Sequence, residues 1–164
     1  MKRVKKGLFL LLWLVMLFTV GIAAAEEGPL EGDQAQGFTL KTLEGKPYGL
    51  KDALSGNRSV LLYFCATWCK DCKTVLPQVI GLTRKYADRL NVLGVNTADR
   101  DSLSKAIEYK KKNSLPYTVV FDEKDEITEN YMVMGFPMFA LVNPQGMIVY
   151  RGAILPQNME KWLK

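Results

Sequence analysis

Two cysteines, Cys69 and Cys72, stand two residues apart in the segment "ATWCKDCK". This spacing fits four kinds of chemistry: a reversible dithiol–disulfide pair, half of a metal site, a haem attachment point, or a structural disulfide. A bridge between such close residues closes almost no loop. It would add little stability, because the stabilisation from a disulfide grows with the length of the loop that it closes. A structural role is therefore a weak reason for the pair.

Haem and metal chemistry need further ligands. Covalent haem attachment requires C-x-x-C-H, and here Lys73 follows Cys72. A zinc site needs four ligands, but the chain has only one further cysteine, Cys65, and no histidine. A copper-delivery domain would also be expected to supply a histidine. We therefore expect neither a metal nor a cofactor. A reversible dithiol remains, in which one exposed, acidic thiol attacks and the other resolves the mixed disulfide.

The flanking residues predict how the pair is positioned. The apolar run Ser59–Cys65 predicts a buried strand, and apolar residues at helical spacing over Lys73–Leu90 predict a helix. Cys69 then lies where the strand meets the helix. There the helix dipole and the free N–H groups stabilise a thiolate. Cys72 falls about one turn into the helix and should be more covered, so we assign Cys69 as the nucleophile and Cys72 as the resolving thiol.

The rest of the chain alternates between strand and helix patterns. These are a hairpin over Phe38–Leu50, a strand over Asn91–Asn96, a helix over Asp101–Lys112 with Asp101 as its cap, a strand over Tyr117–Phe121, a short helix over Glu123–Met132, a hairpin over Met138–Gly152 and a last helix over Met159–Leu163. This order predicts an α/β fold, a three-layer α/β/α sandwich with a mixed central sheet and an N-terminal β-hairpin.

The N-terminus has the pattern of a secretory signal peptide. Basic residues precede the apolar stretch Leu8–Ile22, and small residues end at Ala25. We expect residues 1–25 to be a signal peptide cleaved after Ala25, or an uncleaved membrane anchor. Residues 26–36 are expected to be a flexible lead-in, and residues 37–164 the folded domain. The predicted location is the periplasm, or the outer face of the cytoplasmic membrane, of a bacterium.

Composition limits the other functions. The chain has 164 residues, 48% of them apolar and 24% charged, which suits one domain with its own core. The formal net charge is +5, but four of the positive charges precede the apolar stretch. The one dense basic run, Lys110–Lys112, has no aromatic residues between its lysines. It therefore indicates a solvated helix face rather than a nucleic-acid site.

Several motifs together resemble one family. The span Gly37–Leu163 is similar to the thioredoxin fold, in the TlpA/ResA/CcmG-type branch of exported thiol–disulfide oxidoreductases. The matching residues are Phe38, Leu40, Gly45, Lys46, Leu50 and Asp52 for "F-x-L…G-K…L-x-D", Ala66–Cys72 for "A-T-W-C-x-x-C", Pro77 for the helix proline, Gly135, Phe136 and Pro137 for "G-x-P", and Asn143–Ile148 for the "D-x-x-G-x-I" turn.

The resemblance implies a site and a function. Pro137 should be a cis-proline facing the CxxC motif, with Phe136 beside the disulfide. The backbone before this proline should pair with a substrate peptide as an added strand, and Trp68 should cover the rim of the site. The implied activity is disulfide exchange with exported proteins, as a reductant, with apocytochrome c as the favoured substrate. A membrane-bound or periplasmic electron donor is implied as the other partner.

Four positions depart from the family pattern or adjust the site. Tyr63 stands where thioredoxin keeps a buried acid, and Val75 where ResA-like members have a glutamate. Lys70 and Asp71, between the cysteines, should tune the redox potential in opposite directions. Cys65 stands where thioredoxins usually carry a tryptophan. It is either a small buried hydrophobe or a third redox cysteine.

Two other function classes compete with protein-disulfide reduction. A peroxiredoxin-like thiol peroxidase would need the pocket Pro-x-x-x-Thr-x-x-Cys, but Leu62 and Ala66 occupy its proline and threonine positions. A binding or chaperone module that borrows the fold would have no use for an intact CxxC. Within thiol–disulfide chemistry, a disulfide oxidant or isomerase stays open beside the reductant.

Overall fold

Strand β3 (Ser59–Cys65) lies inside the sheet and positions the site, because the CxxC segment follows it directly. Its residues are buried except for Cys65, as its apolar sequence predicts. It runs parallel to β4 (Leu90–Thr97) and antiparallel to β6 (Met138–Val142). The computed structural model describes residues 28–163 of the chain.

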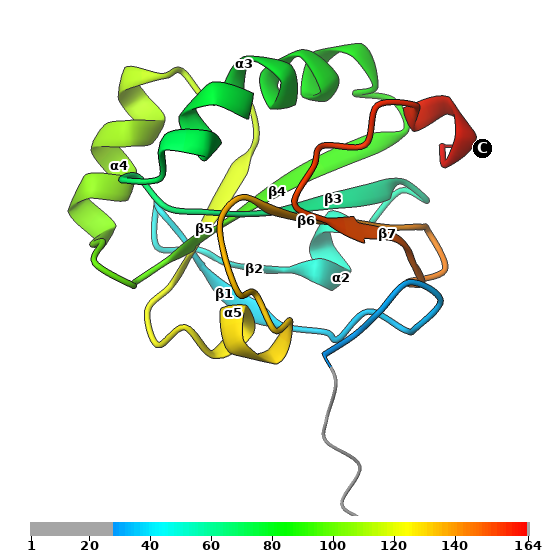
Figure 1. Cartoon of the computed structure of the whole chain (residues 1–164), viewed down its shortest axis with the longest axis horizontal. Coiled ribbons are helices and arrows are strands. Elements are labelled where there is room, and N and C mark those ends of the chain that lie inside the picture. The colour runs from blue at the N-terminus through cyan, green and yellow to red at the C-terminus, as the bar shows by residue number, and fades with distance from the viewer. Residues whose placement is uncertain (1–27, 164) are drawn as a thin grey trace, which may run out of the picture.

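The sheet has seven strands in the order β2-β1-β5-β4-β3-β6-β7 (Figure 1). Strands β3, β4 and β5 are parallel, and the others pair antiparallel, so the sheet is mixed. The remaining strands are β1 (Thr39–Thr42), β2 (Pro47–Gly49), β5 (Thr118–Asp122) and β7 (Ile148–Gly152). The helices are α2 (Leu50–Ala53), α3 (Lys70–Lys85), α4 (Leu103–Lys112) and α5 (Glu126–Asn130), followed by a 3-10 turn, η1 (Met159–Lys161).

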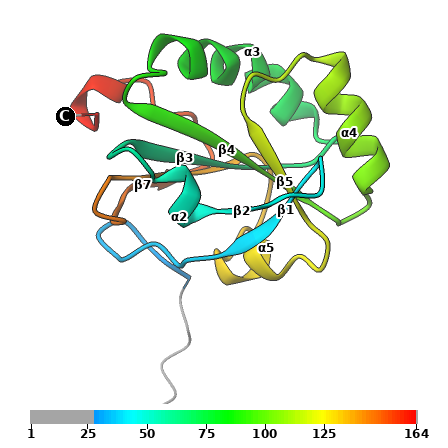
Figure 2. The ribbon, with the colours of Figure 1, turned by 180° about the vertical axis from the view of Figure 1, so that it is seen from behind.

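Helices cover both faces of the sheet, which confirms the predicted three-layer α/β/α sandwich (Figures 1 and 2). Helices α3 and α4 lie on one face, where Leu76, Val79 and Ala106 join a buried apolar cluster with both cysteines of the CxxC motif. Helices α2 and α5 lie on the other face, where Leu50 and Ile127 join a second cluster. The site is therefore built on the α3 face.

All four predicted helices have different bounds in the structure, and the short one predicted over Glu123–Met132 is reduced to α5, Glu126–Asn130. Helix α3 begins at Lys70 and ends at Lys85, and the apolar residue Leu90 belongs to β4 instead. Helix α4 is capped by Ser102, whose hydroxyl accepts from the Lys105 N–H at 3.3 Å, and not by Asp101. The last helix is only the single 3-10 turn η1.

Part of the expected flexible lead-in is tied to β7 by its backbone. The N–H groups of Gly32 and Ile148 donate to Ile148 and Asp33 respectively, and Gln34 forms a bridge with Met147. These bonds fix residues 32–34 against the terminal hairpin, so the description as flexible does not hold for them. The predicted signal peptide or anchor, residues 1–25, lies outside the described residues. Across residues 28–163, no helix has both the length and the apolar character needed to cross a membrane.

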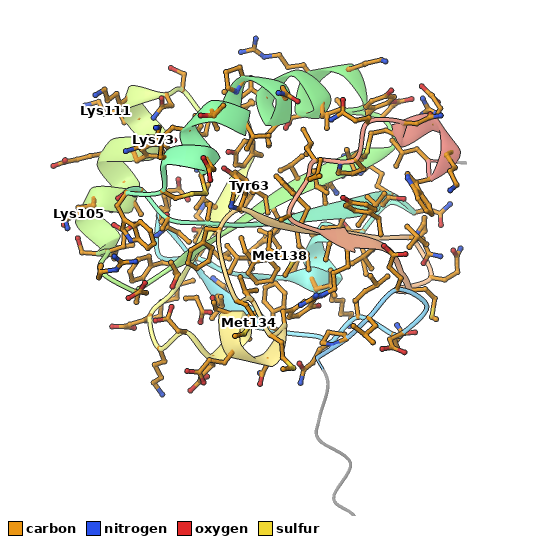
Figure 3. All side chains as sticks on the ribbon, in the orientation of Figure 1. Tyr63, Lys73, Lys105, Lys111, Met134 and Met138 are labelled. Atoms are coloured by element: carbon orange, nitrogen blue, oxygen red, sulfur yellow. A yellow bond between two sulfur atoms is a disulfide. The ribbon has the colours of Figure 1, made fainter. Side chains whose placement is uncertain are left out.

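The basic run of α4 behaves as a solvated helix face. Lys110 forms an ion pair with Glu44 of the β1–β2 turn at 2.7 Å. Lys111 and Lys112 are exposed, and Figure 3 shows Lys105 and Lys111 on the outer side of the helix.

Candidate active site

Cys69 and Cys72 form a disulfide at the start of α3, with their Cα atoms 5.3 Å apart. Cys69 is the N-cap residue of the helix, and its sulfur accepts from the Cys72 N–H at 3.0 Å. Such a donor stabilises negative charge on the sulfur once the disulfide opens. Cys72 is 1% exposed and Cys69 4%, so Cys72 is the more covered, as predicted, but Cys69 is less open than expected because its sulfur is turned toward the helix.

The Phe136–Pro137 peptide bond is cis, as the resemblance implied. It lies just before β6, which is the neighbour of β3 in the sheet, so this corner is brought to the end of the sheet that carries the cysteines. The Phe136 ring meets the Trp68 ring edge to face, with centroids 6.0 Å apart. Trp68 is partly exposed and Pro137 is buried. Trp68 directly precedes Cys69, so the aromatic pair lies next to the CxxC segment.

A groove of about 700 Å³ opens between α3, the segment before β6 and the end of β7. Asp71, which stands between the two cysteines, lines it together with Phe136 and Pro137. Two large apolar side chains stand free at its border, Met134 at 93% and Ile154 at 72% exposure. A groove with exposed apolar groups next to a disulfide suits an extended protein segment.

The charged residues near the groove have different surroundings. Arg151 lines it, but its guanidinium donates to the carbonyls of Tyr131 and Met132 at 2.6 and 3.0 Å. Asp71 and Lys70 are exposed at the first turn of α3. Asp71 is therefore a charge that an incoming segment would meet, while Arg151 is engaged by the protein itself.

Tyr63 takes the place of the acid that thioredoxin keeps under the second cysteine. Its hydroxyl donates to the backbone carbonyl of Cys72 at 3.2 Å, and its ring stacks on Phe139 with centroids 5.1 Å apart. Burial raises the pKa of Tyr63 far above its usual range, so the hydroxyl stays protonated. Tyr63 therefore supports the start of α3 but cannot accept a proton from Cys72.

Cys65 packs at the edge of the same apolar cluster as the CxxC pair. Burial, with a smaller contribution from the Asp101 carboxylate, raises the pKa of the Cys65 thiol to about 12. It is a free thiol in the structure. These surroundings favour an apolar packing role for this half-buried residue over a third redox cysteine.

We predict that Cys65 reacts very slowly in the folded, oxidised protein. Because its pKa is raised to about 12, almost none of it is thiolate at pH 8, and the thiolate is the reactive form. Iodoacetamide followed by peptide mass mapping should leave Cys65 unmodified at pH 8 and modify it at once in urea. Rapid labelling of the folded protein at pH 8 would contradict this assignment.

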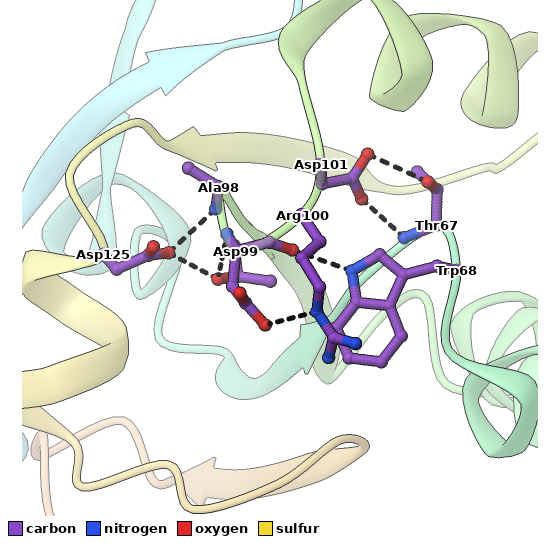
Figure 4. Close-up of polar contacts among 8 residues, drawn as sticks. Thr67, Trp68, Ala98, Asp99, Arg100, Asp101 and Asp125 are labelled. Carbon is purple, nitrogen blue, oxygen red and sulfur yellow. Dashed lines mark hydrogen bonds and ion pairs between the residues drawn. The ribbon is translucent and has the colours of Figure 1, made fainter.

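The loop between β4 and α4, residues 98–102, also contacts the site, and the sequence did not indicate this (Figure 4). Asp101 accepts from the Thr67 N–H and hydroxyl at 2.7 and 2.9 Å. The Trp68 indole N–H donates to the Asp99 carbonyl at 2.7 Å, and the Arg100 guanidinium lies 3.9 Å from the Trp68 ring centroid. Thus this loop holds both residues that precede Cys69.

Comparison with known proteins agrees with this geometry. Residues 31–151 match the model of the AhpC/TSA family. The chain belongs to the AhpC/TSA family. It is 35% identical over 141 residues to the thioredoxin-like protein YneN of Bacillus subtilis, covering 84% of this chain and 81% of the relative. It is 29% identical over 147 residues to the thiol-disulfide oxidoreductase ResA of Bacillus cereus, covering 88% and 83%.

Solved structures of thiol–disulfide oxidoreductases resemble this chain. A thiol:disulfide interchange protein DsbE, described as putative, from Chlorobium tepidum has a TM-score of 0.71 and 26% identity, covering 82% of this chain and 93% of that one. The thioredoxin domain of a thiol-disulfide oxidoreductase from Bacteroides vulgatus has a TM-score of 0.71 and 25% identity, covering 82% and 99%. The fold is thioredoxin-like, and the protein is a thiol–disulfide oxidoreductase.

Proposed function

We propose that this AhpC/TSA member reduces disulfides in exported proteins, with Cys69 as the attacking thiol and Cys72 as the resolving thiol. The observation that carries the proposal is the CxxC disulfide at the N-terminus of α3, beside a groove bounded by the cis Phe136–Pro137 corner. In the reaction, the Cys69 thiolate attacks a sulfur of the substrate disulfide, and the other substrate sulfur leaves as a thiolate. Cys72 then attacks the Cys69 sulfur, which releases the reduced substrate.

Whether the pair acts as a reductant or an oxidant depends on the balance of two effects on its dithiol form. The N–H groups at the start of α3 favour a thiolate and therefore the reduced pair. Burial opposes a thiolate, and the two cysteines lie in an apolar cluster with Leu76 and Leu155. We infer that burial is the larger effect, because both residues are less than 5% exposed. A pair that gives up its electrons readily acts as a reductant.

The proposed partners are exported proteins that carry disulfides, with apocytochrome c as the specific candidate. The signal-like residues 1–25 and the likeness to ResA-type proteins support this choice. A disulfide within a C-x-x-C-H segment folds that short segment into a tight turn, and the groove between α3 and β7, of about 700 Å³, has room for a segment of this size. The oxidised enzyme would be returned to the dithiol by a membrane-bound or periplasmic donor.

Equilibrating the Cys69–Cys72 couple with dithiothreitol buffers tests whether the protein is a reductant or an oxidant. We expect a reduction potential near that of thioredoxin, roughly −270 mV, and catalysis of insulin reduction. A potential near roughly −120 mV would make the protein an oxidant and would contradict the proposal. A peroxide-consumption assay run in parallel tests thiol peroxidase activity. Leu62 and Ala66 are buried apolar residues where a peroxidase pocket would need proline and threonine, so we expect none.

A further inference from the structure

We propose that Asp101 is a positioning residue for the Cys69 nucleophile. Asp101 acts through Thr67. Among residues 28–163, it forms hydrogen bonds with Thr67 but with neither Cys69 nor Cys72. The inference rests on the proposed role of Cys69 as the attacking thiol. The sequence predicts that Asp101 caps α4. In the structure Ser102 is the cap, so the Asp101 carboxylate is available for other contacts.

The active-site loop, residues 66–69, needs an outside support. It connects β3 to α3, and one hydrogen bond inside it, from the Cys69 N–H to the Ala66 carbonyl, closes a turn at 3.2 Å. Thr67 contributes a backbone N–H and a hydroxyl, and both donate to one carboxylate, that of Asp101. Two bonds from one residue to one carboxylate fix both the position and the orientation of Thr67.

Asp101 is itself held rigidly. Its Oδ2 also accepts from the Asn96 side-chain amide at 3.2 Å, and its Oδ1 from the Ser102 N–H at 2.9 Å. Asn96 is buried near the end of β4 and pairs in register with Cys65 of β3. The carboxylate is therefore connected to the sheet, and it transfers that rigidity to Thr67.

The other end of the β4–α4 loop is anchored separately. The Asp125 carboxylate accepts from the Ala98 N–H at 2.8 Å and from the Thr97 hydroxyl (Figure 4). With its two ends fixed, the loop also places Trp68 through the Asp99 carbonyl. Asp101 is the residue of this loop that binds the backbone N–H of Thr67, two residues before Cys69.

The consequence for chemistry concerns the Cys69 sulfur after the disulfide opens. The sulfur gains a donor from the Cys72 N–H only while Cys69 stays at the N-cap of α3. Losing the Thr67 contacts would let the active-site loop move and weaken that donor. A positioning role and a purely electrostatic role of Asp101 predict opposite effects of its substitution on the Cys69 thiolate. Removing a nearby negative charge favours the thiolate, whereas loosening the loop disfavours it.

Charged groups on the surrounding elements stay the same in the test. They are Lys70, Asp71 and Lys73 on α3, and Asp99 and Arg100 on the β4–α4 loop. Tyr63 on β3 remains protonated because burial raises its pKa.

The test measures the rate of Cys69 alkylation by iodoacetamide across pH, in a Cys72→Ser background with Cys65 followed separately by peptide mapping. We expect Asp101→Asn to slow alkylation at pH 7 by about tenfold, the effect of one lost hydrogen bond to a charged group. Thr67→Val keeps the Asp101 charge and removes the hydroxyl bond to it, so alkylation of Cys69 should also be slower. Thr67→Ser keeps the hydroxyl and should keep the wild-type rate. The double variant should be no slower than the slower single variant, because both act through the bonds between Thr67 and Asp101.

The matched control is Asp52→Asn. That carboxylate also accepts a backbone N–H, from Gly49 at 2.8 Å, but it lies at α2 on the opposite face of the sheet. It should lower the unfolding midpoint without changing alkylation of Cys69. Unchanged or faster alkylation in both Asp101→Asn and Thr67→Val would overturn the positioning role. The assay uses no protein substrate, so a failure of insulin reduction would count against the proposed function alone.

Discussion

Cys69→Ser is expected to abolish disulfide exchange, whereas Cys72→Ser is expected to accumulate a covalent adduct with its substrate. The reason is the order of attack: Cys69 lies at the N-cap with a donor to its sulfur, and Cys72 is the more buried of the two. Without Cys72 the attack still occurs, but no thiol remains to release the mixed disulfide. Oxidised insulin and the reduced variant, followed by intact-mass measurement, should show one adduct at Cys69.

The matched comparison comes from the two serine variants under identical conditions. Cys65 is present in both, so an adduct that depends on it would appear in each of them. If Cys69→Ser formed the stable adduct and Cys72→Ser did not, the roles of the two thiols would be reversed.

Tyr63→Ala is expected to lower the free energy of unfolding by about 3–5 kcal/mol, as for other large aromatic residues removed from a core. Tyr63 is 2% exposed and stacks on Phe139 across the β3–β6 pair. Tyr63→Phe keeps the ring and loses only the bond to the Cys72 carbonyl, so it should cost about 1 kcal/mol. Urea unfolding followed by circular dichroism gives both values.

The same two variants distinguish a structural role of Tyr63 from a role in proton transfer. Since the Tyr63 hydroxyl stays protonated and meets a carbonyl, Tyr63→Phe should leave the exchange rate close to that of the wild type. A large loss of rate in a stable Tyr63→Phe protein would mean that the hydroxyl takes part in the reaction. Tyr48→Ala, at the half-exposed edge strand β2, serves as the control and should cost clearly less stability.

Strand β3 and the site cysteines could be predicted because their signals are local. Seven consecutive residues with strand propensity predicted β3 with its observed bounds, Ser59–Cys65. The start of α3 was placed three residues late because its first turn, Lys70 and Asp71, is polar and exposed and carries no apolar period. Its end was placed too late because Leu90 fits the helical spacing and also begins β4.

Asp101 shows what the sequence could not decide. Asp101 and Ser102 are neighbours, and both residue types are good helix caps. The choice depends on Thr67, thirty-four residues earlier in the chain, which engages the Asp101 carboxylate and leaves the cap to Ser102. A contact between two loops that meet only in the folded chain has no period or motif in the sequence. The packing of residues 32–34 against β7 escaped prediction for the same reason.

The bonds between residues 31–35 and β7 also bear on how copies of the protein meet one another. Strand β7 is the last in the sheet order, and an uncovered edge strand offers its backbone groups to a second molecule. Here the Ile148 N–H donates to Asp33 and the Arg151 N–H donates to the Glu31 carboxylate, and the Gly146 carbonyl, in the turn before β7, accepts from Ala35. Residues 31–35 therefore occupy backbone groups of this edge that could otherwise pair with a second molecule, and within residues 28–163 they do not line the groove on the α3 side.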